Sequence, residues 1–265
     1  MQLGGTTALL TGASGGIGQA VARRLHGHGA RVLLSGRRAD ALDALRADLG
    51  GGAEVLVADL AEPGAAAVLA DRAGIVDVLV ANAGLPASGW LETFTPDQID
   101  RALDVNLRAP IHLARALVPG MVDRGRGHLV FVSSLAGKAT SVGSSIYSAT
   151  KFGLRGFAAG LREDLHGSGV GVTVVFPGFI RGAGMYADTR VGLPPWVSMR
   201  SPDDVADAVV RGIETGRPEI DVAPLPLRLG AVASALAPAT AARLQRRLGS
   251  VEVAEALARE QRDKR

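Results

Sequence analysis

Short apolar runs alternate with amphipathic segments along most of the chain. Between the runs, apolar residues recur at spacings of three and four, as at Leu42, Leu45 and Leu49, which is the period of a helix with one buried face. The apolar runs predict strands at Thr7–Thr11, Arg31–Ser35, Glu54–Ala58, Val76–Ala81, Leu129–Val132, Val170–Phe176 and Glu219–Val222. The amphipathic segments predict helices over residues 17–28, 39–49, 62–72, 95–121, 147–165 and 201–215.

This order of elements predicts an α/β fold. Strands separated by helices of this length form βαβ units with right-handed crossovers, which place the strands parallel in one sheet. The strands are apolar almost throughout, as expected when helices cover both faces. We therefore expect a doubly wound, parallel, seven-stranded sheet with helices on both faces, in a single domain over residues 1–265. The domain has a core of about residues 5–225 and a helical C-terminal extension of about residues 226–265.

Composition and charge narrow the class of protein. Hydrophobic residues make up 47% of the chain and charged residues 21%, near the averages of globular proteins. Cysteine is absent, which fits a reducing compartment, so we expect a cytoplasmic protein without a metal site, a signal peptide or a membrane-spanning helix. The net charge is +3, and residues 227–265 alone carry a net +4. The core therefore lacks the broad basic excess of nucleic-acid-binding proteins.

A glycine-rich loop joins the first predicted strand to the first predicted helix. Gly12, Gly16 and Gly18 form a G-x-x-x-G-x-G pattern. Gly12 permits a sharp turn, Gly16 lets the backbone approach a pyrophosphate, and Gly18 lets the helix pack against the strand. Phosphates favour the free N–H groups of a helix N-terminus, so the loop predicts a dinucleotide site. The other loop residues of this site are Ser14, Gly15 and Ile17. The alternative is a glycine-rich turn without a ligand.

Two arginines follow the second predicted strand, where a dinucleotide fold meets the adenosine ribose. Arg37 and Arg38 stand there in place of the carboxylate that would bind the 2′-hydroxyl of NAD. A guanidinium can hold a 2′-phosphate bidentately, whereas a carboxylate would repel it. The pair therefore predicts NADP(H) rather than NAD(H). Alternatively, both arginines are solvated residues at the start of the next helix.

Tyr147 and Lys151 lie four residues apart at the start of a predicted helix and therefore share one face. A tyrosine hydroxyl with a pKa near ~10 is a poor base at neutral pH, and a nearby ammonium lowers that pKa. A phenol tuned in this way can give a proton to a forming alkoxide or take one from an alcohol. The alternative is a half-buried tyrosine beside a surface lysine.

Over roughly residues 5–225 the chain resembles the short-chain dehydrogenase/reductase family of Rossmann-fold oxidoreductases. The glycine loop is similar to the family's T-G-x-x-x-G-x-G motif, and Tyr147 and Lys151 match its Y-x-x-x-K motif. The further matches, in chain order, are Asp59-Leu60, Asn82-Ala83-Gly84, Asn106, Ser134 and Pro177-Gly178 with Ile180. Taken alone, each of these has an ordinary structural alternative, such as a turn residue, a helix cap or a polar helix residue.

The resemblance implies a role for each matching residue. Tyr147 would be the general acid and base, and Lys151 would lower its pKa and bind the nicotinamide ribose. Ser134 would donate a hydrogen bond to the substrate oxygen, and Asn106 would hold a water in a proton relay with Lys151. Asp59 and Leu60 would hold adenine, Asn82, Ala83 and Gly84 would line the cofactor, and Pro177, Gly178 and Ile180 would face nicotinamide. The implied activity is NADP(H)-dependent interconversion of a ketone or aldehyde and an alcohol.

Residues 179–200 break every period and predict a lid over the site. Its large side chains suit an apolar substrate; they are Phe179, Ile180, Met185, Tyr186, Leu193, Trp196 and Met199. Trp90 and Phe94 lie on a second loop that either faces the substrate or packs on its surroundings. Arg181 either reaches a substrate acid or the cofactor phosphates, or is a solvated loop residue.

The C-terminal extension predicts an amphipathic helix over residues 227–248, interrupted at Pro238. We favour its packing on the domain or on a partner subunit over contact with a membrane surface. The resemblance also implies a homodimer or homotetramer, and we expect no nucleic-acid partner. Two alternatives to the oxidoreductase remain open: a protein of this fold that senses NADP(H) without turnover, and a non-redox relative such as a dehydratase or isomerase.

Overall fold

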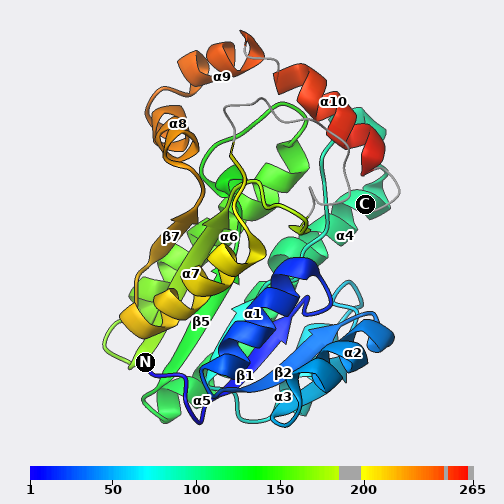
Figure 1. Cartoon of the computed structure of the whole chain (residues 1–265). Helices are drawn as coiled ribbons and strands as arrows, with labels where there is room; N and C mark the ends of the chain where they lie inside the picture. The colour runs from blue at the N-terminus through cyan, green and yellow to red at the C-terminus, as the bar shows by residue number, and fades with distance from the viewer. Residues whose placement is uncertain (185–197, 248–249, 262–265) are drawn as a thin grey trace.

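Seven parallel strands form one sheet in the order β3-β2-β1-β4-β5-β6-β7 (Figure 1). The computed structural model describes residues 1–184, 198–247 and 250–261. The strands are β1 (Thr7–Thr11), β2 (Arg31–Gly36), β3 (Ala53–Val57), β4 (Val78–Ala81), β5 (Gly127–Val132), β6 (Val170–Pro177) and β7 (Glu219–Val222). All seven predicted strands are present, and the expected doubly wound parallel sheet is confirmed.

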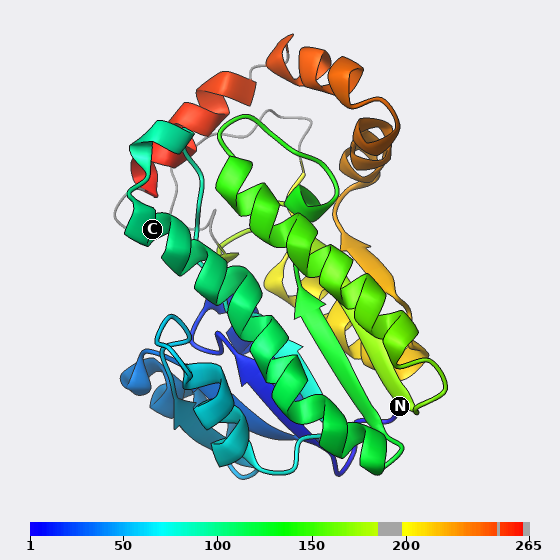
Figure 2. The same cartoon turned by 180° about the vertical axis from the view of Figure 1, so that it is seen from behind.

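Helices cover both faces of the sheet (Figures 1 and 2). One face carries α1 (Gly16–Gly27), α2 (Ala39–Leu49) and α7 (Pro202–Thr215), and the other carries α3 (Ala65–Ala73), α5 (Ala109–Asp123) and α6 (Ser145–Asp164). Successive strand residues point to opposite faces, so Leu10 and Leu34 pack in the first layer while Leu9 and Leu33 pack in the second. These side chains are almost fully buried, which explains the continuous apolar runs of the strands.

The helix predicted over residues 95–121 contains an irregular turn. The chain forms α4 (Pro96–Leu103), a π turn (Asp104–Arg108) and then α5. Thr95 caps α4: its hydroxyl accepts a hydrogen bond from the Gln98 N–H at 3.3 Å, and the Gln98 side chain accepts one from the Thr95 N–H at 3.1 Å. The π turn places Asn106 in the middle of an otherwise continuous helical rod.

The third helix begins later than its predicted start at residue 62. Asp59 accepts a hydrogen bond at its carbonyl oxygen from the N–H of Glu62, which forms a turn. Gly64 caps α3 at a φ of +78°, in the left-handed region that favours glycine. The turn explains why the regular helix starts only at Ala65.

The C-terminal extension forms three helices, and the first break falls at Pro238, where an interruption was expected. These are α8 (Leu225–Leu236), α9 (Pro238–Arg247) and α10 (Ser250–Glu260), and α9 starts at Pro238 because proline fits the first turn of a new helix. Figure 1 shows them as an arch above the carboxyl edge of the sheet, the edge at which the parallel strands end. Ala254 of α10 packs near Gly143, in the loop before α6, so part of the extension does contact the domain, as expected.

Candidate active site

The predicted site residues gather at the carboxyl edge, where β1 and β4 are neighbours. The chain reverses its winding direction between these strands, because β2 and β3 lie to one side of β1 while β5, β6 and β7 lie beyond β4. Loops after adjacent strands diverge at such a switch point and leave a crevice for a ligand. The glycine loop follows β1, Asn82-Ala83-Gly84 follows β4, Ser134 follows β5 and Gly178 follows β6.

Two of the three loop glycines are required by close backbone contacts. Gly12 has a φ of +67°, and a Cβ there would lie 2.8 Å from the Cα atom of Ala83. A Cβ on Gly18 would collide with the carbonyl oxygen of Gly12, so glycine lets α1 pack against the end of β1 as predicted. The close neighbour of Gly16 is Ala183, because a Cβ on Gly16 would lie 2.7 Å from the Ala183 Cβ. The segment after β6 therefore contacts the glycine loop.

Thr11 joins the glycine loop to the segment after β4. Its hydroxyl accepts hydrogen bonds from the N–H groups of Asn82 and Ala83, both at 3.1 Å. The side-chain amide of Asn82 donates in return to the carbonyl oxygens of Thr11, at 3.1 Å, and Gly12, at 3.2 Å. In the sequence, Thr11 matched the first position of the T-G-x-x-x-G-x-G motif but was assigned no role.

Several features at the start of α1 favour an anion. Gly15 caps this helix without a side-chain hydrogen bond, and among the described residues its first turn contains no acid. Gly15 and Gly16 are exposed, so the N-terminal N–H groups face an accessible surface. Ile17 is half-buried below them. This end of α1 therefore has the chemistry of a phosphate site.

Arg37 and Arg38 occupy two different places beside that loop. Arg38 donates a hydrogen bond of 2.7 Å to the carbonyl oxygen of Ser14. Arg37 lies 4.0 Å from the Asp59 carboxylate, which also pairs with Arg101 at 3.5 Å. Asp59 thus lies between two guanidiniums, and its second oxygen accepts a hydrogen bond from the N–H of Ala61. The neighbouring Leu60 is half-buried against the sheet face that carries α3.

The Lys151 ammonium lies close to the ring of Tyr147. It is 5.7 Å from the ring centroid, and Lys151 is only 3% exposed. Lys151 Nζ donates a hydrogen bond of 3.2 Å to the carbonyl oxygen of Val132, at the end of β5. Burial lowers the pKa of Lys151 to about 8, because the interior disfavours the charged form.

The pKa of Tyr147 shifts in the direction opposite to the predicted one. Burial raises it to about 12, while a side-chain hydrogen bond with Ser134 acts in the lowering direction. Burial outweighs the effect of Ser134 because the phenol loses more solvation on ionising than this one hydrogen bond returns. Tyr147 therefore holds its proton at neutral pH in the cofactor-free protein, as a general acid must.

The turn after β5 holds Ser134 against α6. Ser133 donates a hydrogen bond of 3.2 Å to the carbonyl oxygen of Lys151. A Cβ on Gly137 would lie 2.7 Å from that same oxygen, so glycine allows the close approach. The Ser134 hydroxyl also accepts a hydrogen bond from the N–H of Ala136 at 3.2 Å. Ser134 thus caps a turn, which is its ordinary structural role, and it also makes the contact with Tyr147 that a catalytic role needs.

Asn106 is fully buried and fixes the chain just beyond Asn82-Ala83-Gly84. Its Oδ1 accepts a hydrogen bond of 2.6 Å from the N–H of Leu85, and its Nδ2 donates one of 3.0 Å to the Leu85 carbonyl oxygen. Nδ2 also lies 3.5 Å from the hydroxyl of Thr150 in α6. Asn106 therefore connects the π turn, the segment after β4 and the helix that carries Tyr147.

The two ends of the predicted lid are joined. The backbone N–H of Arg181 donates a hydrogen bond of 2.8 Å to the carbonyl oxygen of Arg200. The backbone N–H of Arg200 donates one of 2.9 Å to the carbonyl oxygen of Phe179. Pro177 and Ile180 are buried at the base, and the N–H of Gly178 donates to the Val222 carbonyl oxygen at 3.0 Å. Met199 is half-buried and Arg181 is exposed. The other predicted lid residues, Met185, Tyr186, Leu193 and Trp196, lie outside the described residues.

The second predicted loop packs on its surroundings. Phe94 is 9% exposed and belongs to a small cluster with Ala87 and Ala102, against which Tyr147 also packs. Trp90 is exposed. The cluster that contains Phe94 therefore supports the position of Tyr147.

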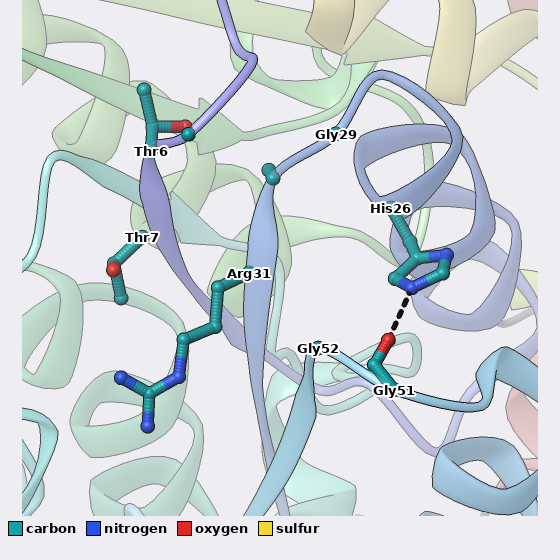
Figure 3. A pocket seen from close by; sticks show the side chains of 9 residues that line it. Thr6, Thr7, His26, Gly29, Arg31, Gly51 and Gly52 are labelled. Carbon is teal, nitrogen blue, oxygen red and sulfur yellow. Dashed lines mark hydrogen bonds between the residues drawn. The ribbon is translucent and has the colours of Figure 1, made fainter.

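A shallow pocket at the opposite edge of the sheet carries no comparable chemistry (Figure 3). It is lined by residues at the amino ends of β1 and β2 and by the turn before β3. His26 Nε2 is 2.7 Å from the carbonyl oxygen of Gly51, and Arg31 pairs with Glu54. His26 and Arg31 thus already have partners within the protein, and none of the predicted site residues lines the pocket. Across the part of the chain that the structure describes, no group of three or more His, Asp or Glu side chains is arranged to hold a metal.

Comparison with known proteins shows the relatives of this chain. Residues 6–192 match the model of the short chain dehydrogenase family. The ketoacyl reductase HetN of Nostoc sp. is 34% identical over 262 residues, which cover 94% of this chain and 91% of HetN. The NADP-dependent 3-hydroxy acid dehydrogenase YdfG of Salmonella typhi is 39% identical over 181 residues, covering 66% of this chain and 72% of YdfG. Among solved structures, a short-chain dehydrogenase from Sphingobium yanoikuyae in complex with NADPH is 33% identical, with a TM-score of 0.77 and coverage of 89% of this chain and 95% of that one.

Proposed function

The chain belongs to the short-chain dehydrogenase family of oxidoreductases that act on CH–OH groups, and from this premise we propose its reaction. We propose that it interconverts a ketone or aldehyde and an alcohol on an apolar substrate with NADP(H), Tyr147 being the general acid and base. The observation that carries the proposal is the packing of three groups: the Tyr147 phenol, the Ser134 hydroxyl that bonds to it, and the buried Lys151 ammonium.

The residues at the carboxyl edge fit a phosphorylated dinucleotide. The uncapped start of α1 offers N–H groups for a pyrophosphate, and Arg38 places a cation beside Ser14. We propose that Arg37 and Arg38 hold the 2′-phosphate and that Asp59 and Leu60 lie near adenine. Asn82, Ala83, Gly84, Pro177, Gly178 and Ile180 would line the rest of the crevice. The NADPH complex of the Sphingobium yanoikuyae enzyme and the NADP dependence of YdfG support this cofactor.

The bound cofactor supplies or accepts the hydride, and the protein handles the proton. In the reducing direction the Tyr147 hydroxyl donates its proton to the substrate oxygen, and Ser134 donates a hydrogen bond to the same oxygen. The Lys151 ammonium stabilises the phenolate that remains. Both amide atoms of Asn106 have partners in the protein, so we propose that it acts by positioning the segment after β4 and α6.

A direct experiment compares wild type, Tyr147→Phe and Ser145→Ala. Ser145 is exposed in the first turn of α6, so its variant removes one oxygen near Tyr147 without touching the proposed site. Each protein is titrated with NADPH by fluorescence and then assayed by NADPH absorbance with a panel of apolar ketones. Tyr147→Phe should bind NADPH normally and lose turnover, while Ser145→Ala keeps both. Wild-type binding without any turnover would favour a sensing protein, and substrate conversion at constant NADPH would favour a non-redox relative.

A further inference from the structure

A stripe of large apolar side chains is exposed along α8. Leu225, Leu229, Val232 and Leu236 are 61%, 59%, 58% and 82% exposed. Their spacings of four, three and four place them on one side of the helix, and we call them the α8 stripe. This concentration is unusual, since soluble proteins rarely leave such a contiguous apolar surface open.

The opposite side of α8 makes its contacts with the rest of the chain. Ala231 and Ser234 are buried there, and Leu227 is half-buried. Arg228 is the one charged residue in the helix, so α8 is apolar almost all round. A helix of this kind is normally covered on every side. Within the described residues, the α8 stripe is left open.

The charged residues of α8 and α9 are all arginines, one of which, Arg228, lies 3.7 Å from the Asp221 carboxylate of β7. Residues 225–247, which span α8 and α9, contain four arginines and no Asp or Glu; the arginines are Arg228, Arg243, Arg246 and Arg247. A second copy of this face would bring like charges together, whereas a surface of anionic lipid would complement them. An apolar stripe flanked by arginines has the composition of helices that lie in a membrane interface.

The helix length and position fit the same partner. Twelve residues make a helix of about 18 Å, well short of the ~30 Å hydrocarbon core, so α8 would lie along the surface. Among the residues that the structure describes, none of the helices is long and apolar enough to cross a bilayer. Figure 1 shows α8 directly after β7, at the carboxyl edge of the sheet. The glycine loop follows β1 at the same edge, and Tyr147 lies near the start of α6.

We propose that α8 docks on an anionic lipid surface. The α8 stripe enters the boundary between headgroups and acyl chains, and the net positive charge of residues 225–247 attracts the anionic headgroups. Docking in this way holds the carboxyl edge of the sheet close to the membrane, where apolar substrates are concentrated. The binding itself does not depend on the proposed oxidoreductase reaction, so the two can fail separately.

The test is sedimentation of the full-length protein with vesicles of phosphatidylcholine and phosphatidylglycerol, compared with phosphatidylcholine alone. We expect binding to the anionic vesicles that weakens between about 0.05 M and about 0.5 M NaCl. Leu229→Ser and Leu236→Ser should each lower the affinity about tenfold, since each removes a leucine side chain that docking would bury in the lipid. The matched control is Ile75→Ser, because Ile75 is 70% exposed and precedes β4 at the opposite edge. Arg243→Glu should also weaken binding, whereas Arg46→Glu on α2 should not.

Other results would overturn the proposal. These are absence of binding to anionic vesicles, equal binding to neutral vesicles, and binding that the leucine variants leave intact. Sedimentation velocity without lipid can give a further result that would overturn the proposal. If Leu229→Ser and Leu236→Ser convert an oligomer into a monomer, the α8 stripe is covered by a second copy of the chain. Circular dichroism and NADPH titration confirm that each variant is folded.

Discussion

Arg38 Nη2 donates a hydrogen bond of 2.7 Å to the carbonyl oxygen of Ser14 and so holds a guanidinium beside the glycine loop. The Ser14 side chain lies next to the end of β2, since a Cβ on Gly36 would be 3.2 Å from the Ser14 hydroxyl. Arg37, although adjacent in sequence, is directed to Asp59 at 4.0 Å. The two arginines therefore differ in what they offer a nucleotide.

Replacing Arg38 by alanine should weaken NADPH binding about tenfold or more, because a charge-assisted hydrogen bond to the 2′-phosphate is lost. The affinity for NADH, which lacks this phosphate, should stay nearly unchanged. Fluorescence titration with both nucleotides measures the difference, with Arg46→Ala, at an exposed position on α2 outside the proposed site, as the control. An equal loss for NADPH and NADH would mean that Arg38 only supports the loop.

The rate of ketone reduction should fall as the pH rises through about 8. The pKa of Lys151 is lowered to about 8 by burial, so the ammonium that stabilises the Tyr147 phenolate is lost above that value. Steady-state profiles of kcat/KM from pH 6 to 10 would show this limb in wild type. Lys151→Arg should remove the limb, because a guanidinium stays charged throughout this range. If the limb persists in Lys151→Arg, another group is responsible for it.

Asn106→Ala should destabilise the fold by about 2 kcal/mol, because it leaves the buried N–H and carbonyl oxygen of Leu85 without partners. Urea unfolding followed by circular dichroism measures the change. Gln98→Ala, which removes an exposed capping contact in the same helical rod, should cost clearly less. Equal effects of the two substitutions would contradict a special role for Asn106.

Stability should decrease as the pH falls from about 6.5 towards 4. Burial chiefly, with smaller effects from the N-terminal ammonium and Arg162, lowers the pKa of His128 from 6.5 to about 4. In this range the unfolded chain therefore binds a proton that the folded chain does not bind. The free energy of unfolding falls by about 3 kcal/mol by pH 4. Urea midpoints at pH 7 and pH 5 should differ less in His128→Asn than in wild type. His166→Gln, at an exposed site, should behave like wild type.

The parts of the site that are local in sequence could be predicted from the sequence. The glycine loop and the Tyr147–Lys151 pair each lie within a few residues, so spacing alone identified them. Contacts between distant segments depend on the order of strands in the sheet. Thr11 meets Asn82 only because β4 is the neighbour of β1, and the pattern of apolar runs does not state that order.

Burial by distant elements also determines properties that could not be predicted from the sequence, such as the pKa of a site residue and the packing of the extension. The pKa of Tyr147 rises because segments far along the chain cover the phenol, so a prediction from its nearest charge had the wrong sign. The extension illustrates the same limit. Its composition indicated helices, but only the structure shows that Ala254 packs on the domain while Leu229 and Leu236 do not.

The π turn at Asp104–Arg108 makes the spacing between α4 and α5 intolerant of deletion. A π turn contains one residue more than an α-helical stretch that makes the same advance. Removing that residue would restore a regular helix but swing α4 by about 100° around the shared axis. The helix would survive this shortening, whereas the amide of Asn106 would no longer point at Leu85, so a shorter chain here would be a well-formed but misaligned enzyme.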